Sequence, residues 1–376
     1  MSHNRFEALD SWRGICACMV ALFHFAAVSH ISEFSLVKNA YLFVDFFFVL
    51  SGFVIAANYR SRLAHGFGFG RFMLLRLGRI YPLHFVLMLL FIPIDIAKDG
   101  IGPDLWRALV TNTLLLHSLG VNNELWLNFP SWSISAEFAA YIVFALVVIR
   151  VGEGLLPWTL PIIAGPLVLA FVSPYAMDST YDYGFVRCIY GFALGVICFD
   201  LRQRWPELSR PLGMAADTLI EVAATLIVFV CLSLASGPYS WTVASPFLFA
   251  VLVLVFARQG GAVSRLLTTR PLLLIGALSY SIYMVHALVR AVVRASAMAL
   301  EHSFGWRLFV DSVDYRGEPT RLLWVAGSPW LADLLQIAML LATIAMAMLT
   351  WRYIEEPGRL WSRRLVSQAP RRVVAE

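Results

Sequence analysis

The sequence predicts an all-α integral membrane protein with about ten transmembrane helices. Of its 376 residues, 60% are hydrophobic and 14% are charged, and the mean hydropathy is +0.73. A soluble chain carries about 25% charged residues, so this chain has too few to cover a water-facing surface. Apolar runs of about 16 to 20 residues recur along the whole length, as helices that cross a hydrocarbon layer of about 30 Å require.

We expect each apolar run to form one spanning helix. The expected spans are 14–30, 41–58, 80–97, 132–150, 158–173, 184–199, 217–235, 242–257, 272–294 and 331–353. The segment 105–118 is too short to span comfortably and is expected to lie at an interface. Residues 1–356 are interpreted as one transmembrane domain, and residues 357–376 as a short basic tail.

The arginines predict the orientation of the chain. With a cytoplasmic N-terminus and ten crossings, most of the 29 lysine and arginine residues fall on cytoplasmic loops and in the tail. This agrees with the positive-inside rule and predicts that both termini are cytoplasmic in a multi-pass protein of the inner, or plasma, membrane. The net charge of +5 therefore reflects topology and does not indicate nucleic-acid binding.

Two patterns are interpreted as packing features rather than sites. The five cysteines all lie inside or at the edge of apolar runs, so neither a disulfide framework nor a metal site is expected. Cys16 and Cys18 are two positions apart and would face different directions on a helix. Gly191 and Gly195 form a GxxxG pattern, which predicts a close contact between two helices.

The stretch LDSWRGICACMVALFH places a cation and an imidazole on one helical ridge. Arg13 and His24 are eleven residues apart, which is close to three full turns, so their side chains should share one face. The helical rise separates them by roughly 16 Å along the axis. With the predicted orientation, Arg13 lies at the inner membrane boundary and His24 in the outer half.

Five ionisable residues from five expected helices converge on the outer half of the membrane: His24, Asp45, Glu137, Arg187 and His286. Ionisable residues inside a membrane are costly and indicate function by default. Each also has a structural alternative. His24 could donate a hydrogen bond between helices, Glu137 could pair with Arg187 to fix packing, and Asp45 could be a solvated helix start.

A polar stripe accompanies His286. Ser279, Tyr283, His286 and Arg290 recur at spacings of four, three and four, which places them on one helix face too polar for lipid. That face should line a cavity or a helix interface. A histidine close to a carboxylate in a site of low dielectric is the usual construction of a general base.

The inner boundary has a different character. Arg13, Arg76 and Arg79 are expected at the cytoplasmic ends of two helices. A guanidinium cluster suits phosphate recognition because its donors form a rigid fork. The alternative is contact with lipid headgroups.

Seven sequence blocks in order resemble those of acyltransferase family three, the bacterial integral-membrane acyltransferases of surface and secreted carbohydrates. The resemblance covers about residues 5–360. The blocks are LDSWRGICACMVALFHF (9–25), VDFFFVLSGFVIA (44–56), RLGRIYPLH (76–84), PSWSISAEF (130–138), Arg187 with GFALG (191–195), LSYSIYMVH (278–286) and IEEP (354–357). The resemblance implies ten core helices and a stand-alone member, without the soluble hydrolase-like domain that some members carry.

The resemblance also implies an O-acyltransferase. It would take an acyl group, most readily acetyl, from cytoplasmic acyl-CoA to a hydroxyl of a glycan such as an exopolysaccharide or O-antigen. No permanently bound cofactor and no metal are expected; membrane lipid, donor and acceptor are the expected partners. The expected catalytic residues are His24, Glu137 and Arg13, the donor-binding residues are Arg13, Arg76 and Arg79, and the substrate-binding residues are Asp45, Ser133, Arg187, Tyr283 and His286.

Within that scheme His24 would take the hydroxyl proton or carry the acyl group, and Glu137 would orient the His24 imidazole. Ser133, Tyr283 or His286 would bind the oxyanion.

The alternative function is a proton-coupled transporter that exports a glycolipid or polysaccharide. Transport would predict internal repeats with broken helices in matching positions, and the sequence shows no such self-similarity.

Overall fold

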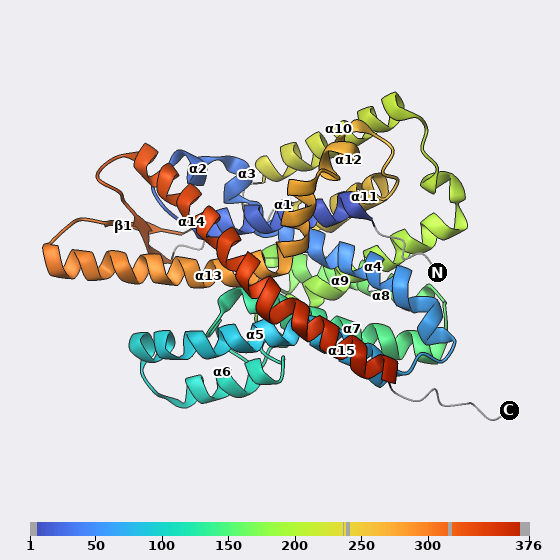
Figure 1. The fold of residues 1–376 in the computed structure, drawn as a ribbon, viewed down its shortest axis with the longest axis horizontal. Helices are drawn as coiled ribbons and strands as arrows, with labels where there is room; N and C mark the ends of the chain where they lie inside the picture. Colours follow the sequence, from blue (N-terminus) through green and yellow to red (C-terminus); the bar gives the residue numbers. More distant parts are fainter. Residues whose placement is uncertain (1–5, 236, 238–240, 315–317, 369–376) are drawn as a thin grey trace.

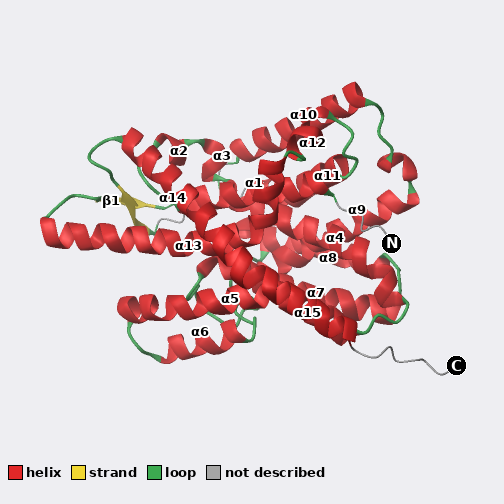
Figure 2. Ribbon diagram, in the orientation of Figure 1, coloured by secondary structure: helices red, strands yellow, loops and turns green. Residues whose placement is uncertain are grey.

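The fold is a helical bundle in a computed structural model that describes residues 6–235, 237, 241–314 and 318–368 (Figure 1). Figure 2 shows that the regular secondary structure of the described chain is helical apart from one two-stranded hairpin. The α-helices are α1 (Glu7–His24), α2 (His30–Glu33), α3 (Ser35–Lys38), α4 (Phe43–Ala64), α5 (Phe69–Asp99), α6 (Pro103–Thr113), α7 (Trp132–Val151), α8 (Leu156–Phe171), α9 (Gly184–Arg204), α10 (Met214–Ser233), α11 (Ser245–Phe256), α12 (Ala262–Leu267), α13 (Arg270–Phe304), α14 (Pro329–Thr350) and α15 (Glu356–Gln368). The short elements are η1 (Ala40–Leu42), η2 (Phe129–Ser131), η3 (Ala176–Asp178), η4 (Pro206–Ser209), η5 (Trp241–Ala244), η6 (Trp351–Glu355), β1 (Phe309–Val313) and β2 (Pro319–Leu323).

The membrane class is confirmed by the length and composition of the helices. Seven helical segments are long and apolar enough to cross a membrane: Ala40–Ala64, Phe69–Asp99, Phe129–Val151, Gly184–Arg204, Met214–Ser233, Arg270–Phe304 and Pro329–Gln368. Two shorter apolar helices, Leu156–Phe171 and Trp241–Phe256, and α1 occupy the remaining expected positions. The segment expected at an interface forms the short helix α6, which packs against α5.

Two helix boundaries differ from the expectation in ways that matter for the site. Helix α1 ends at His24 rather than at residue 30, because the chain turns at Phe25. Helix α5 begins at Phe69 rather than at residue 80, so the arginines expected in a cytoplasmic loop lie on its first turns. Gly68 precedes this helix and Gly100 follows it, and apolar spacing could not place either boundary.

Helices α1 and α13 pack closely beside the site. A Cβ atom on Gly14 would lie 2.6 Å from the backbone nitrogen of Gly276, so only glycine permits this approach. The contact brings Arg13 beside Ser279 at one end of the pair and His24 beside His286 at the other. Arg13 and His24 therefore share the face of α1 that meets α13, as their spacing predicts.

Helices α4 and α9 form the second close pair. A Cβ atom on Gly195 would lie 2.6 Å from the nitrogen of Phe53, and one on Gly191 would lie 3.1 Å from the Cβ of Phe48. The GxxxG pattern thus marks a helix contact, as predicted. The contact holds α9 against the helix that carries Asp45.

The far end of α13 projects beyond the bundle and is covered by the hairpin of β1 and β2 (Figure 1). The strands pair antiparallel, from Phe309 opposite Leu323 to Val313 opposite Pro319. The nitrogen of Val28 donates to the Leu323 carbonyl at 2.9 Å, which attaches the hairpin to the segment that follows α1. Nothing in the apolar pattern of the sequence predicts this hairpin.

The segment interpreted as a basic tail is structured over its described part. Helices α14 and α15 are joined by the π-helical turn Trp351–Glu355, and α15 packs along α5. A Cβ atom on Gly358 would lie 2.6 Å from Cγ of Pro82. Residues 369–376 of the expected tail lie outside the described residues. The start of α1 and the end of α15 lie at the same end of the bundle in Figure 1; which face of the membrane that end meets stays a prediction.

Candidate active site

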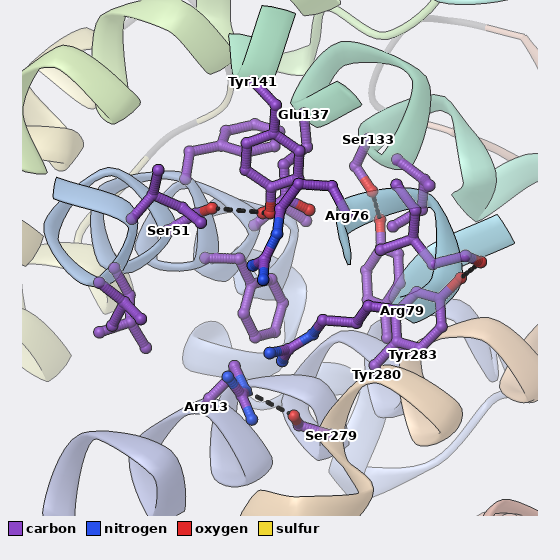
Figure 3. Close-up of a pocket in the computed structure, with 18 residues that line it drawn as sticks. Arg13, Ser51, Arg76, Arg79, Ser133, Glu137, Tyr141, Ser279, Tyr280 and Tyr283 are labelled. Carbon is purple, nitrogen blue, oxygen red and sulfur yellow. Dashed lines mark hydrogen bonds between the residues drawn. The ribbon is translucent and has the colours of Figure 1, made fainter. Parts of the chain in front are cut away.

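A cavity with a free volume of about 100 Å³ lies inside the bundle, among α1, α4, α5, α7 and α13 (Figure 3). One part of its lining is apolar, which suits a thin hydrocarbon chain. The polar lining is concentrated in side chains that were singled out from the sequence and in neighbours of theirs. The polar residues are Arg13, Ser51, Arg76, Arg79, Ser133, Glu137, Tyr141, Ser279, Tyr280 and Tyr283.

Three arginines meet at this cavity. Figure 3 shows the side chains of Arg13, Arg76 and Arg79 extending toward the same part of it. Nε of Arg13 donates to Oγ of Ser279 at 2.6 Å, and Nη2 of Arg76 donates to the hydroxyl of Tyr59 at 2.9 Å. These bonds fix the guanidinium planes and leave further donors for a ligand. The predicted clustering of the three arginines is therefore present.

Glu137 faces the same cavity from α7. The hydroxyl of Tyr141 donates to Oε1 of Glu137 at 2.6 Å and lies 3.1 Å from Oγ of Ser51. The structure does not bring Glu137 to the His24 imidazole as expected, because Glu137 lies with the arginine cluster and accepts a hydrogen bond from Tyr141. Depth estimates from helix rise resolve about one turn and could not separate these two positions.

Ser133 and Tyr283 line the cavity and contact each other. Oγ of Ser133 donates to the Tyr283 hydroxyl at 2.9 Å, and the Tyr283 hydroxyl donates to the Pro130 carbonyl at 3.1 Å. The ring of Tyr283 also lies 5.8 Å, between centroids, from the ring of His286. Tyr283 therefore stands between the cavity and the histidine described next.

His24 and His286 form a pair of imidazoles at the other end of the α1–α13 contact. Their rings are nearly parallel, with centroids 4.9 Å apart. Nδ1 of His24 lies 2.9 Å from the Val20 carbonyl and 3.1 Å from Nε2 of His286. A carbonyl can only accept, so Nδ1 of His24 carries a proton and Nε2 of His24 presents a lone pair. The structural arrangement of His24 thus leaves a basic nitrogen available.

The histidine pair has two neighbours that were not among the expected site residues. The Phe129 ring lies 4.8 Å from the His24 ring and 6.0 Å from the His286 ring, between centroids. The guanidinium carbon of Arg290 lies 5.4 Å from the Phe129 centroid. Arg290 belongs to the polar stripe that the spacing of His286 already marks, and that stripe was the signal that could have identified it.

Asp45 and Arg187 bind each other rather than facing the cavity. Nε and Nη2 of Arg187 each donate to Asp45 at 2.8 Å, and Nη2 also donates to the Tyr41 carbonyl at 2.9 Å. Asp45 is 0% exposed and Arg187 is 1% exposed. Asp45 is therefore not a solvated helix start, and the partner of Arg187 is Asp45 instead of Glu137. The pair crosses the α4–α9 contact, and neither residue lines the cavity.

Glu355 is a further buried carboxylate near the arginine cluster. It is 6% exposed and lies in the π-helical turn, where its Oε2 accepts from Oγ of Ser281 at 2.8 Å. Arg13 and Arg79 are close enough to interact electrostatically with it. The IEEP block contains this residue, but nothing in its local pattern indicates that its partners lie on α1, α5 and α13.

Comparison with known proteins identifies the family of the chain. Residues 6–352 match the family model described as an acyltransferase domain, that of acyltransferase family three. The chain belongs to this family. It is therefore a multi-pass membrane protein that catalyses acyl transfer, and the transporter considered as an alternative is not supported.

Two relatives share part of the family sequence. The chain is 35% identical over 160 residues to "Protein 2 in picA locus" of Rhizobium radiobacter, which covers 38% of this chain and 82% of that protein. It is 36% identical over 115 residues to the acyltransferase MdmB of Streptomyces mycarofaciens. This match covers 27% of this chain and 27% of that protein. No solved structure matches the chain.

Proposed function

We propose that this acyltransferase takes a small acyl group, most readily acetyl, from acyl-CoA at its cytoplasmic end and transfers it to a carbohydrate hydroxyl. The observation that carries the proposal is that two functional features lie along the same contact between helices α1 and α13. An arginine-lined cavity lies at one end of the α1–α13 pair, and a histidine with an available lone pair lies at the other. The first suits the donor, and the second suits the acceptor.

At the donor end, Arg13, Arg76 and Arg79 would face the phosphate-bearing part of CoA, since guanidinium groups bind phosphate oxygens through paired donors. The narrow, partly apolar cavity would hold the thin arm that carries the thioester. Glu137 accepts its hydrogen bond from Tyr141 at this end, and we assign it to holding Tyr141 and balancing the charge of the arginines.

At the acceptor end, Nε2 of His24 would take the proton from the attacking hydroxyl. The hydroxyl oxygen then forms a bond to the thioester carbonyl carbon, and the carbon–sulfur bond breaks as the thiolate of CoA leaves. The thiolate receives the proton from the His24 imidazolium, which restores the starting tautomer. The N–H at Nδ1 of His24 is shared between the Val20 carbonyl and Nε2 of His286, and both acceptors hold the ring in the reactive orientation.

The developing oxyanion needs a donor close to the histidine pair. Tyr283 is suited to this task because its hydroxyl lies at the cavity wall and its ring lies next to His286. Its O–H, which donates to the Pro130 carbonyl in this structure, would turn toward the oxyanion. Ser133 donates to that hydroxyl and would orient it. Arg290, on the same face of α13 as His286, adds a positive charge beyond Phe129.

The acceptor class rests on the family resemblance. An exopolysaccharide, an O-antigen or a related glycan presented at the outer leaflet would supply the hydroxyl, and a transfer of this kind modifies the cell surface. Mass spectrometry of surface glycans from cells with and without the protein would identify the acylated sugar.

The experiment that tests the proposal is acyl transfer from labelled acetyl-CoA to a glycan fraction by membranes that contain the protein. The His24→Gln variant should lose activity by roughly 10²-fold or more, because the general base is absent. His65→Gln provides the matched control, since that imidazole is exposed at the end of α4 and does not line the cavity. Normal activity in His24→Gln would refute the assignment of the base.

A further inference from the structure

A second, larger cavity opens next to the first and is strongly basic. Its free volume is about 550 Å³, within the range of small-molecule sites. Arg76 and Arg79 line both cavities, so the two are neighbours that share a wall. The second cavity is lined by Tyr59, Arg62, Phe67, Arg71, Leu75, Arg76, Arg79, Arg359, Ser362, Arg363, Val366 and Ser367.

Three elements form the second cavity. Arg62 lies in the last turn of α4, and Arg71 lies in the first turns of α5. Helix α15 contributes Arg359 and Arg363 from the segment that the sequence suggested was a tail. Its packing against α5 is close, because Gly358 fits against Pro82 without a side chain. The C-terminal helix is therefore a wall of this cavity.

The positive charge of the lining of the second cavity suits an anionic ligand. Six of its lining residues are arginines, and none of the described residues that line it is acidic. Arg359 is bound by Glu356 at 2.6 and 2.7 Å, and Arg62 is held over the Phe67 ring at 4.1 Å from the centroid. Arg363 lies close enough to Arg76 and Arg359 for the like charges to repel. A bound phosphate group would relieve that repulsion with charge-assisted hydrogen bonds.

We propose that helix α15 completes the binding site for the nucleotide phosphates of the acyl donor, with Arg363 and Arg62 as phosphate ligands in addition to Arg76 and Arg79. The identity of the donor rests on the proposed function. The shared wall at Arg76 and Arg79 would let one ligand extend its phosphates into the large cavity and its acyl arm into the narrow one. The headgroup of an anionic lipid offers the same phosphate chemistry, so the test separates the two sources.

The primary measurement is equilibrium binding of CoA to the purified full-length protein in an uncharged detergent. Arg363→Gln should weaken CoA binding by roughly tenfold, the value of one charge-assisted hydrogen bond. 3′-Dephospho-CoA shows whether the lost contact is to the ribose phosphate or to the pyrophosphate, because the discrimination between the two ligands shrinks in the first case. Arg364→Gln is the matched control: that arginine is adjacent on α15, exposed, and outside the cavity lining, so CoA binding should not change.

A second variant tests the helix rather than the charge. Gly358→Leu would push α15 away from Pro82 and should weaken CoA binding while every arginine is retained. To test whether the cavity binds a lipid headgroup instead, the variants are reconstituted in nanodiscs with and without phosphatidylglycerol. If Arg363→Gln reduces lipid retention and leaves CoA binding unchanged, the cavity is a lipid site and the proposal is wrong.

The two proposals fail in different ways. If the wild-type protein binds CoA and Arg363→Gln binds it as well as Arg364→Gln does, the role of α15 is refuted and the proposed function stands. If the wild-type protein does not bind CoA at all, the proposed donor is wrong and this inference falls with it. Tenfold weaker binding confined to Arg363→Gln and Gly358→Leu supports the assignment.

Discussion

The ion pair of Asp45 and Arg187 yields the most quantitative prediction. Replacing Asp45 by Leu leaves the Arg187 guanidinium buried at 1% exposure, with the Tyr41 carbonyl as its strongest remaining partner. Removing one partner of a buried pair costs about 3–5 kcal/mol. For a protein of 376 residues such a loss corresponds to a fall in Tm of about 4–6 °C. The double variant Asp45→Leu/Arg187→Met removes both charges and should recover most of that loss, because apolar replacement of a whole buried pair is often neutral.

The assay combines thermal unfolding of the purified protein with acyl-transfer rates for the wild-type protein and both variants. A structural pair predicts that the double variant regains stability and that its activity follows stability. If the double variant is stable but its KM for the acceptor rises sharply, the pair contacts the substrate. That result would refute the structural assignment made from its burial.

Four further predictions concern the contact between α1 and α13. His286→Ala should lower kcat by roughly tenfold or more with little change in KM for the donor, whereas His286→Asn should recover part of the rate because an amide oxygen accepts from Nδ1 of His24; equal rates for the two variants would contradict this. Tyr283→Phe should lower kcat on the order of tenfold without loss of Tm, and an unchanged kcat would exclude its hydroxyl from oxyanion binding. Arg290→Gln should lower the rate more than Arg290→Lys in steady-state kinetics, and identical losses would show that charge at this position is irrelevant. Gly14→Leu should separate the helices and abolish both activity and the native Tm, while a stable, active variant would disprove the close contact.

Much of the bundle could be predicted from the sequence because its signals are strong and local. Apolar runs located the helices, and the eleven-residue spacing placed Arg13 and His24 on one face. The GxxxG pattern at Gly191 and Gly195 marked a real helix contact. Each of these inferences uses the sequence pattern of only one or two helices, and none depends on the order in which the helices are arranged around the bundle.

The partners of buried charges could not be predicted, because they depend on that order. Arg187 had two carboxylates at a suitable depth, and the structure pairs it with Asp45 because α4 and α9 are adjacent. Glu137 lies at a similar calculated depth to His24, yet α7 directs it toward the arginines. The packing of α15 against α5 could not be predicted either, because a basic segment with low hydropathy is typical of a solvated tail.

The central claim is that one helix contact connects a cytoplasmic donor site with an acceptor site across the membrane. Inverted membrane vesicles test it directly, with labelled acetyl-CoA supplied outside and the glycan acceptor enclosed inside. The account predicts that label enters the enclosed glycan with the wild-type protein and not with His24→Gln, while CoA is released outside. Label that reaches glycan only when donor and acceptor are on the same side of the membrane would contradict it.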